Sequence, residues 1–157
     1  MKKYHFVLYL LFMSVMVACS DSDKDDEVPI IDMTVENAFP QNCVAVFKGE
    51  TFVFKARLID NVELGSYSIE MHNNFDHHTH STSITECDLD PVKTPVNPLY
   101  FVNEYTIPAG QVDYIATQNI TIPTDVDAGD YHFMLRVTDK GGWQTFEGIS
   151  LKIVERE

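Results

Sequence analysis

The chain has 157 residues, with 24 acidic and 11 basic side chains, and its formal net charge at pH 7 is −13. This acidity argues against nucleic acids or anionic lipid head groups as ligands, because both are themselves negatively charged. The length is sufficient for one domain of ordinary size.

The first 18 residues have the pattern of a secretory signal: Lys2 and Lys3, then an apolar run over residues 6–18. The run is shorter than the roughly 20 residues that a membrane-spanning helix needs. Cys19, which follows it, resembles the lipidated cysteine of the bacterial lipobox, although Met16 is unusual at the first position of that motif. The resemblance implies that residues 1–18 are a signal peptide and that lipid on Cys19 holds the protein on a membrane. The alternative is an ordinary signal peptide with an incidental cysteine.

Residues 19–28 are polar and strongly charged until Val28, and we expect a flexible tether after the lipidated cysteine. The segment Lys24-Asp25-Asp26 resembles the signal that sends Bacteroidetes lipoproteins to the outer face of the outer membrane. It implies a protein anchored in the outer membrane and exposed at the cell surface. A generic acidic spacer is the alternative reading.

From residue 29 to residue 157 the pattern is that of β-strands, because apolar and polar residues alternate between Gly, Pro, Asn and Asp. Residues 73–110 are irregular apart from one expected edge strand, and Gly148 suggests a bulge in the last strand. The expected strands cover residues 30–35, 44–47, 51–59, 66–72, 99–106, 114–122, 131–138 and 143–154.

About seven short strands at this spacing predict an all-β fold, an immunoglobulin-like antiparallel β-sandwich. The segment around Tyr131, residues 127–133, resembles the tyrosine corner of such domains, in which the tyrosine hydroxyl bonds to the upstream backbone. A strand tyrosine placed there by chance is the alternative. The resemblance makes residues 66–72 strand C and residues 131–138 strand F, which are antiparallel neighbours in that fold.

The nonapeptide HNNFDHHTH at residues 72–80, with the segment at 128–132 and the Gly-Trp turn near Trp143, resembles a family of uncharacterised Bacteroidetes surface lipoproteins. Members of that family carry one immunoglobulin-like domain of unknown function. The resemblance implies the immunoglobulin-like fold and localisation at the cell surface, and it implies no activity.

Once Cys19 carries lipid, Cys43 and Cys87 remain as a pair. In an exported protein such a pair indicates a disulfide. Two buried free thiols are the alternative.

Five histidines follow the signal segment, and four of them fall within residues 72–80. Neutral imidazole binds zinc and copper. His72 ends strand C and His132 begins strand F, and a register that pairs them keeps both core faces inward, with side chains about 4.5–5.5 Å apart at Cβ. We therefore expect a zinc or copper(II) site at His72 and His132, completed by His77, His78 or His80.

In this site, Asp76 or Asp130 would accept a hydrogen bond from a ligating ring. The competing interpretation is a polar loop whose histidines pack on aromatic rings or bond locally.

Three functions remain open. The first is a non-catalytic binding or envelope-assembly module with a protein partner in the envelope. Tyr100, Phe101 and Tyr105 would either form its contact surface or cover a sheet edge. The second is a metal-binding lipoprotein. A metal-dependent hydrolase is the remote third, because no HExxH, nucleophile elbow or phosphate loop is present. Asp60 and Asp139 could bind calcium, but they lack EF-hand spacing and we expect ordinary solvated turns there.

Overall fold

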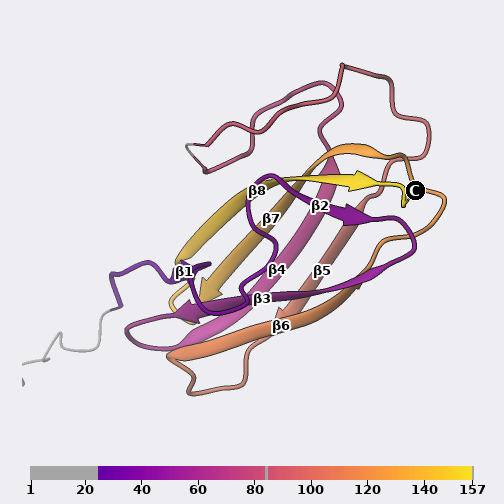
Figure 1. Cartoon of the computed structure of the whole chain (residues 1–157). Coiled ribbons are helices and arrows are strands. Elements are labelled where there is room, and N and C mark those ends of the chain that lie inside the picture. The colour runs from indigo at the N-terminus through magenta and orange to yellow at the C-terminus, as the bar shows by residue number, and fades with distance from the viewer. Residues whose placement is uncertain (1–24, 84, 157) are drawn as a thin grey trace, which may run out of the picture.

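The computed structural model describes residues 25–83 and 85–156, so the expected signal peptide and Cys19 lie outside the described residues. The chain is an all-β sandwich of two sheets (Figure 1). Within the described part of the chain, no helix is long and apolar enough to cross a membrane. The strands are β1 (Ile30–Asp32), β2 (Val44–Phe47), β3 (Thr51–Ile59), β4 (Leu64–Asn73), β5 (Phe101–Thr106), β6 (Asp113–Thr121), β7 (Gly129–Asp139) and β8 (Gln144–Val154).

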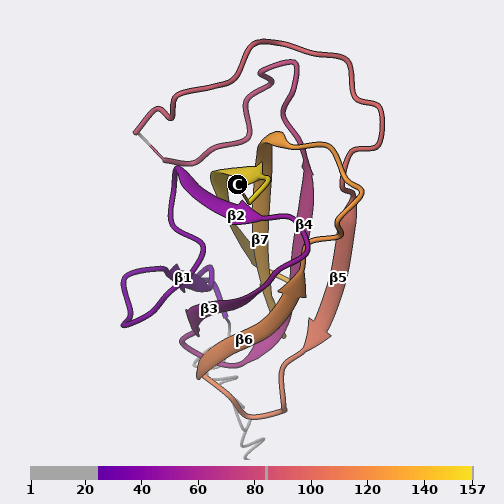
Figure 2. The same cartoon turned by 45° about the vertical axis from the view of Figure 1, so that its right-hand side comes forward.

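The two sheets differ in size: one has the order β1-β3-β6 and the other β2-β8-β7-β4-β5. Figure 2 shows them as two layers, with β3 and β6 in front of β7 and β4. β4 and β7 are antiparallel neighbours, as expected for strands C and F, and β5 is an edge strand, also as expected. All strands and the whole core lie between residues 30 and 154, so a chain that begins at Ser20 keeps every strand and core contact.

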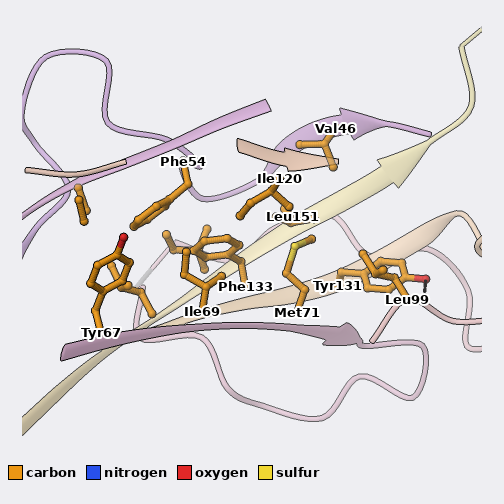
Figure 3. Close-up of a cluster of buried hydrophobic side chains, with 14 of the residues drawn as sticks. Val46, Phe54, Tyr67, Ile69, Met71, Leu99, Ile120, Tyr131, Phe133 and Leu151 are labelled. Atoms are coloured by element: carbon orange, nitrogen blue, oxygen red, sulfur yellow. Dashed lines mark hydrogen bonds between the residues drawn. The ribbon is translucent and has the colours of Figure 1, made fainter. Parts of the chain in front are cut away.

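The core lies between the sheets, where strand alternation sends one set of side chains inward. Tyr67, Ile69 and Met71 of β4 are at most 1 % exposed. Figure 3 shows them beside Phe133 of β7 and facing Phe54 of the other sheet. The rings of Phe54 and Phe133 are 5.6 Å apart, so aromatic packing joins the two layers.

Tyr131 forms the predicted corner. Its hydroxyl donates to the carbonyl oxygen of Asp127 at 2.8 Å and accepts from the amide of Leu99 at 3.1 Å. The side chain is fully buried, so both bonds satisfy a polar group that has left water. They also fix the start of β7, where His132 is the next residue.

β1 is shorter than expected and ends at Asp32 rather than at residue 35. The reason is local, because the Asp32 carboxylate accepts from the amide of Thr34 at 2.8 Å and turns the chain. All eight expected segments form strands, and the short β1 and β2 each pair with a sheet, β2 in parallel with β8.

Gly148 does not form a bulge, so that prediction is wrong. The ladder between β7 and β8 is continuous, with Gly148 opposite Met134. Glycine is needed for a different reason: a Cβ here would lie 1.9 Å from the carbonyl oxygen of His80. The missing side chain therefore lets the loop lie directly on the sheet.

The long loop between β4 and β5, described over residues 74–83 and 85–100, extends beyond the end of β4 and the start of β7 (Figure 2). The predicted disulfide between Cys43 and Cys87 is present and attaches the loop to the start of β2. Thr82 donates its amide to the carbonyl of Gly148 at 3.0 Å, and Asp90 donates its amide to the Asp130 carboxylate at 2.7 Å. These contacts hold the loop at several points along its path.

Candidate metal centre

His72 and His132 lie directly opposite each other on β4 and β7. The predicted register is therefore confirmed, including the pairs Glu70 with Met134 and Ser68 with Arg136. Neither ring faces the core, because the neighbouring residues Met71 and Phe133 do so. His132 is nevertheless only 2 % exposed, since the long loop covers this end of the sheet.

His78 and His80 of the loop join this pair. The six distances between ring centres of the four histidines all lie between 5.0 and 5.5 Å. Four points with nearly equal mutual distances form a tetrahedron. His72, His78 and His80 each offer one ring nitrogen, and these three atoms lie within 4.8 Å of one another.

The loop is seated on β7 by a hydrogen bond from the site itself. His132 Nε2 donates to the carbonyl oxygen of His78 at 2.9 Å. A carbonyl only accepts, so in the neutral ring Nδ1 carries the lone pair. That Nδ1 is buried and has no hydrogen-bond partner among the described residues. A buried nitrogen without a partner is costly, which makes this atom a ready ligand.

Two carboxylates orient two of the other rings. Glu70 accepts from His72 Nδ1 at 3.0 Å, and Asp76 accepts from His78 Nδ1 at 2.5 Å. The proton then resides on Nδ1 and the lone pair on Nε2, as in the carboxylate–histidine pairs of zinc sites. Asp76 was one of the two acceptors expected from the sequence. The other, Asp130, lies 3.5 Å from Lys152 instead.

Glu70 was missed in the sequence, although a signal for it exists. It precedes His72 by two residues on the same strand, so both side chains project from the same face. An acid two residues before a strand histidine is therefore a pattern worth searching for.

Burial lowers the pKa of His72 and of His132 from the ordinary value of 6.5. For His72 the nearby Glu70 carboxylate opposes this effect in part. Burial disfavours the charged imidazolium, so both rings are neutral at pH 7. Neutral imidazole is the form that binds a metal ion.

His77 does not belong to the group, which corrects its place in the expected site. Its Nε2 donates to the carbonyl oxygen of Asp90 at 2.8 Å. Its backbone is left-handed, with φ of 62°, at the point where the loop turns. The ring is therefore engaged elsewhere in the loop.

The four rings lie between two open grooves. One, with a volume of about 500 Å³, runs over the outer face of the larger sheet and is lined by residues that include His80 and Glu70. The other, of about 400 Å³, is lined by residues that include His78 and His132. Solvent and small ions therefore reach the cluster, and His80 is itself exposed.

Of the two roles expected for the aromatic side chains near β5, two of the three residues take the second, which is to cover the sheet edge. Tyr100 is 72 % exposed, but Phe101 and Tyr105 are partly buried and pack against the core. The Tyr105 ring stacks on that of Tyr67 at 4.9 Å. These two aromatics cover the sheet edge rather than form a docking patch.

The chain belongs to the family described as "Domain of unknown function (DUF4625)", which its sequence matches over residues 17–154. No curated protein matches the chain. The matched range includes all eight strands and the four clustered histidines. The family identifies one uncharacterised domain and assigns it no activity.

Proposed function

We propose that this domain binds one zinc ion through His72, His78, His80 and His132 and acts as a non-catalytic metal-binding module. The observation that carries the proposal is the near-regular tetrahedron of ring centres. Around a tetrahedral zinc with Zn–N bonds of about 2.0–2.1 Å, imidazole centres would lie about 5.1–5.3 Å apart. The six distances, 5.0–5.5 Å, all lie within about 0.2 Å of that range.

The tautomers support the same ligand set. Glu70 and Asp76 hold Nε2 of His72 and His78 free, and the His78 carbonyl holds Nδ1 of His132 free. The ring nitrogens of His72, His78 and His80, which lie within 4.8 Å of one another, must still draw together to about 3.4 Å, the ligand spacing of tetrahedral zinc, and His132, which is outside that group of three, must bring its Nδ1 closer as well. His78 and His80 belong to a loop, and its side chains make that adjustment.

The geometry favours zinc over copper(II). Copper(II) prefers tetragonal coordination, whereas zinc accepts a tetrahedron without electronic cost. Copper binds nitrogen sites more tightly in general, so it is the competitor that any titration must include.

The number of ligands favours binding over catalysis. A catalytic zinc site keeps one position open for water, whereas four imidazoles close a tetrahedron. A metal-dependent hydrolase would need one of the four histidines to leave the metal. The domain therefore serves to take up, hold or sense zinc.

We further propose that the module works at the cell surface. The signal-like residues 1–18, Cys19 and the acidic segment after it support lipid anchorage in the outer membrane. Cys43 and Cys87 form a disulfide, which accords with an exported protein. The tyrosine corner and the β4–β7 pairing support an immunoglobulin-like relationship, as in the Bacteroidetes lipoproteins that the sequence resembles.

Isothermal titration of the metal-stripped chain from Ser20 onward, purified without an affinity tag, tests the proposal. We expect one zinc ion per chain with sub-micromolar affinity, and loss of at least about a hundredfold in a His72→Ala/His132→Ala variant, or about 2.7 kcal/mol. The matched control is His77→Ala, which removes a loop histidine that bonds to Asp90 instead.

Three results would contradict the proposal. They are affinity weaker than high micromolar, tight zinc binding that survives the double substitution, and equal loss in the His77→Ala control. A parallel copper(II) titration decides between the metals: a large preference for copper under competition would replace zinc in this assignment.

A further inference from the structure

A second group of metal-ligating side chains lies at the other end of the sandwich. Asp25, Asp60 and Asp139 each offer one carboxylate oxygen, and these atoms lie within 4.8 Å of one another. Asp60 follows β3 and Asp139 ends β7, while Asp25 precedes the first strand. The turn after β3 and the turn after β7 are joined by a bond from the Lys140 amide to the Glu63 carbonyl at 2.9 Å.

The two turn aspartates are buried, contrary to the solvated turns expected from the sequence. Asp60 is 6 % exposed and Asp139 is 4 % exposed. One oxygen of each closes its own turn: Asp60 Oδ2 accepts from the amides of residues 62 and 63, and Asp139 Oδ1 from those of 142 and 143. These bonds fix both carboxylates in place.

The remaining oxygens have no hydrogen-bond partner in the part of the chain that the structure describes. Asp60 Oδ1, Asp139 Oδ2 and both carboxylate oxygens of Asp25 are hidden from water without a hydrogen bond from any described residue. Among the described residues, every Lys and Arg ion pair involves other carboxylates. Buried carboxylate oxygens are expected to be paired or to bind a metal ion, and among the described residues no donor and no cation pairs with these four oxygens.

Two features of the β7–β8 turn hold Asp25 beside Asp60 and Asp139. Its carbonyl oxygen accepts from Trp143 Nε1 at 3.0 Å. Gly141 leaves room for its carboxylate, because a Cβ there would lie 3.0 Å from Asp25 Oδ2. The segment expected to be a tether therefore contacts the domain at Asp25.

We propose that Asp25, Asp60 and Asp139 bind one calcium ion, which fastens the chain before β1 to the base of the domain. Calcium takes six to eight oxygen ligands in flexible geometry, and four unpaired carboxylate oxygens supply the protein part of such a shell. Waters complete it. The ligands are hard oxygens, unlike the imidazoles at the other end, so the two sites select different metals.

The chain contains one tryptophan, Trp143, which reports on this site because it touches Asp25. We therefore titrate the chain from Ser20 onward with CaCl2 and follow tryptophan emission and thermal unfolding. We expect a saturable emission change with a midpoint of about 0.1–1 mM, the range of extracellular calcium modules, and a rise in Tm at saturation.

Substitutions of the proposed ligands are compared with substitutions of residues outside the site. Asp139→Asn changes a buried residue of the fold, and we expect it to lower stability by itself. Asp25→Asn is therefore the decisive variant, because Asp25 lies outside every strand. Both should weaken the calcium response at least tenfold. Asp26→Asn, an exposed neighbour with the same change in charge, should leave it intact, and so should His72→Ala/His132→Ala.

The proposal is overturned by the absence of a saturable response up to about 10 mM calcium, tenfold above the weakest extracellular modules. It is also overturned if Asp25→Asn responds to calcium as strongly as the control Asp26→Asn and the unaltered chain do. An equal response to MgCl2 would contradict the calcium assignment, because magnesium requires a tighter octahedral shell.

Discussion

The two ends of the sandwich both gather metal-ligating side chains, and they do so by different means. At one end, β4 and β7 present His72 and His132, and a loop attached by a disulfide adds His78 and His80. At the other end, two turns and the segment before β1 bring three aspartates together. β4 joins the two ends over ten residues, about 30 Å.

The two sites are held in place by different parts of the chain. The histidine site depends on a long loop that follows β4 directly but lies on β7 and β8, which are distant in sequence, so the loop must be held there by the disulfide and by hydrogen bonds. The aspartate site is built from tight turns whose own backbone amides hold the carboxylates. Changes that loosen the loop should therefore weaken zinc binding and leave calcium binding unchanged.

Removal of the disulfide should have the largest effect. In a Cys43→Ser/Cys87→Ser variant, the loop closed over a sequence separation of 44 residues is released, which costs about 3–4 kcal/mol of unfolding free energy in the chain-entropy model. Urea unfolding measures this loss. Zinc affinity should fall with it, while the calcium-dependent emission of Trp143 persists; simultaneous loss of both responses would show that the two ends are not independent.

The second-largest effect should come from the carboxylates of Glu70 and Asp76, which accept hydrogen bonds from His72 and His78. Glu70→Gln and Asp76→Asn keep a hydrogen-bond acceptor but remove its charge, and each should weaken zinc binding by about 10–100-fold. Competition against a chelator of known affinity measures the change. Glu104→Gln is the matched control, since that carboxylate bonds to Ser66 rather than to a histidine. An unchanged affinity in both acid variants would argue against ligation by His72 and His78.

Gly148→Ala tests the contact between loop and sheet without touching a ligand. The new Cβ would lie 1.9 Å from the His80 carbonyl oxygen, so the loop or the strand must move. We expect zinc affinity to fall about tenfold, or about 1.4 kcal/mol, with the fold retained by circular dichroism. Gly110→Ala is the control: a Cβ there meets no atom within 4 Å, and although its φ of 78° adds backbone strain, Gly110 lies in the turn before β6, far from the histidine loop. Unchanged zinc affinity in Gly148→Ala would show that zinc binding does not depend on the position of His80.

The smallest effect is a pH dependence of the metal-free domain. Burial lowers the folded-state pKa of His72 and His132 below 6.5, so the unfolded chain binds protons more readily than the folded one. Stability is therefore full above pH 6.5 and declines as the pH falls from there through the lowered values. Urea unfolding at about pH 7.5 and about pH 5.5 measures the decline. The His72→Ala/His132→Ala variant should show a flatter profile, and an equally steep one would place the titrating groups elsewhere.

Much of the fold could be predicted because the alternation of apolar and polar residues along a strand fixes which side chains face the core. Tyr67, Ile69 and Met71 had to share one face, and that choice also set the register of His72 against His132. Cys43 and Cys87 were the only pair left for a disulfide once Cys19 was assigned to lipid. These inferences needed only strand geometry and the chemistry of exported cysteines.

The parts that could not be predicted depend on the path of irregular chain. No periodicity says that His77 turns toward Asp90 while His78 and His80 turn toward the sheet. Gly148 was taken for a bulge because its neighbour in space, His80, is 68 positions away in the chain and invisible to a local pattern. Asp60 and Asp139 resembled ordinary turn residues, and only their burial against Asp25 distinguishes them.

X-ray absorption at the zinc edge of the loaded chain, starting at Ser20, tests the central claim most directly. We expect one zinc per chain with four nitrogen ligands at about 2.0–2.1 Å and the outer-shell scattering of imidazole rings. A first shell of five or six oxygens, or fewer than three imidazoles per zinc, would contradict it.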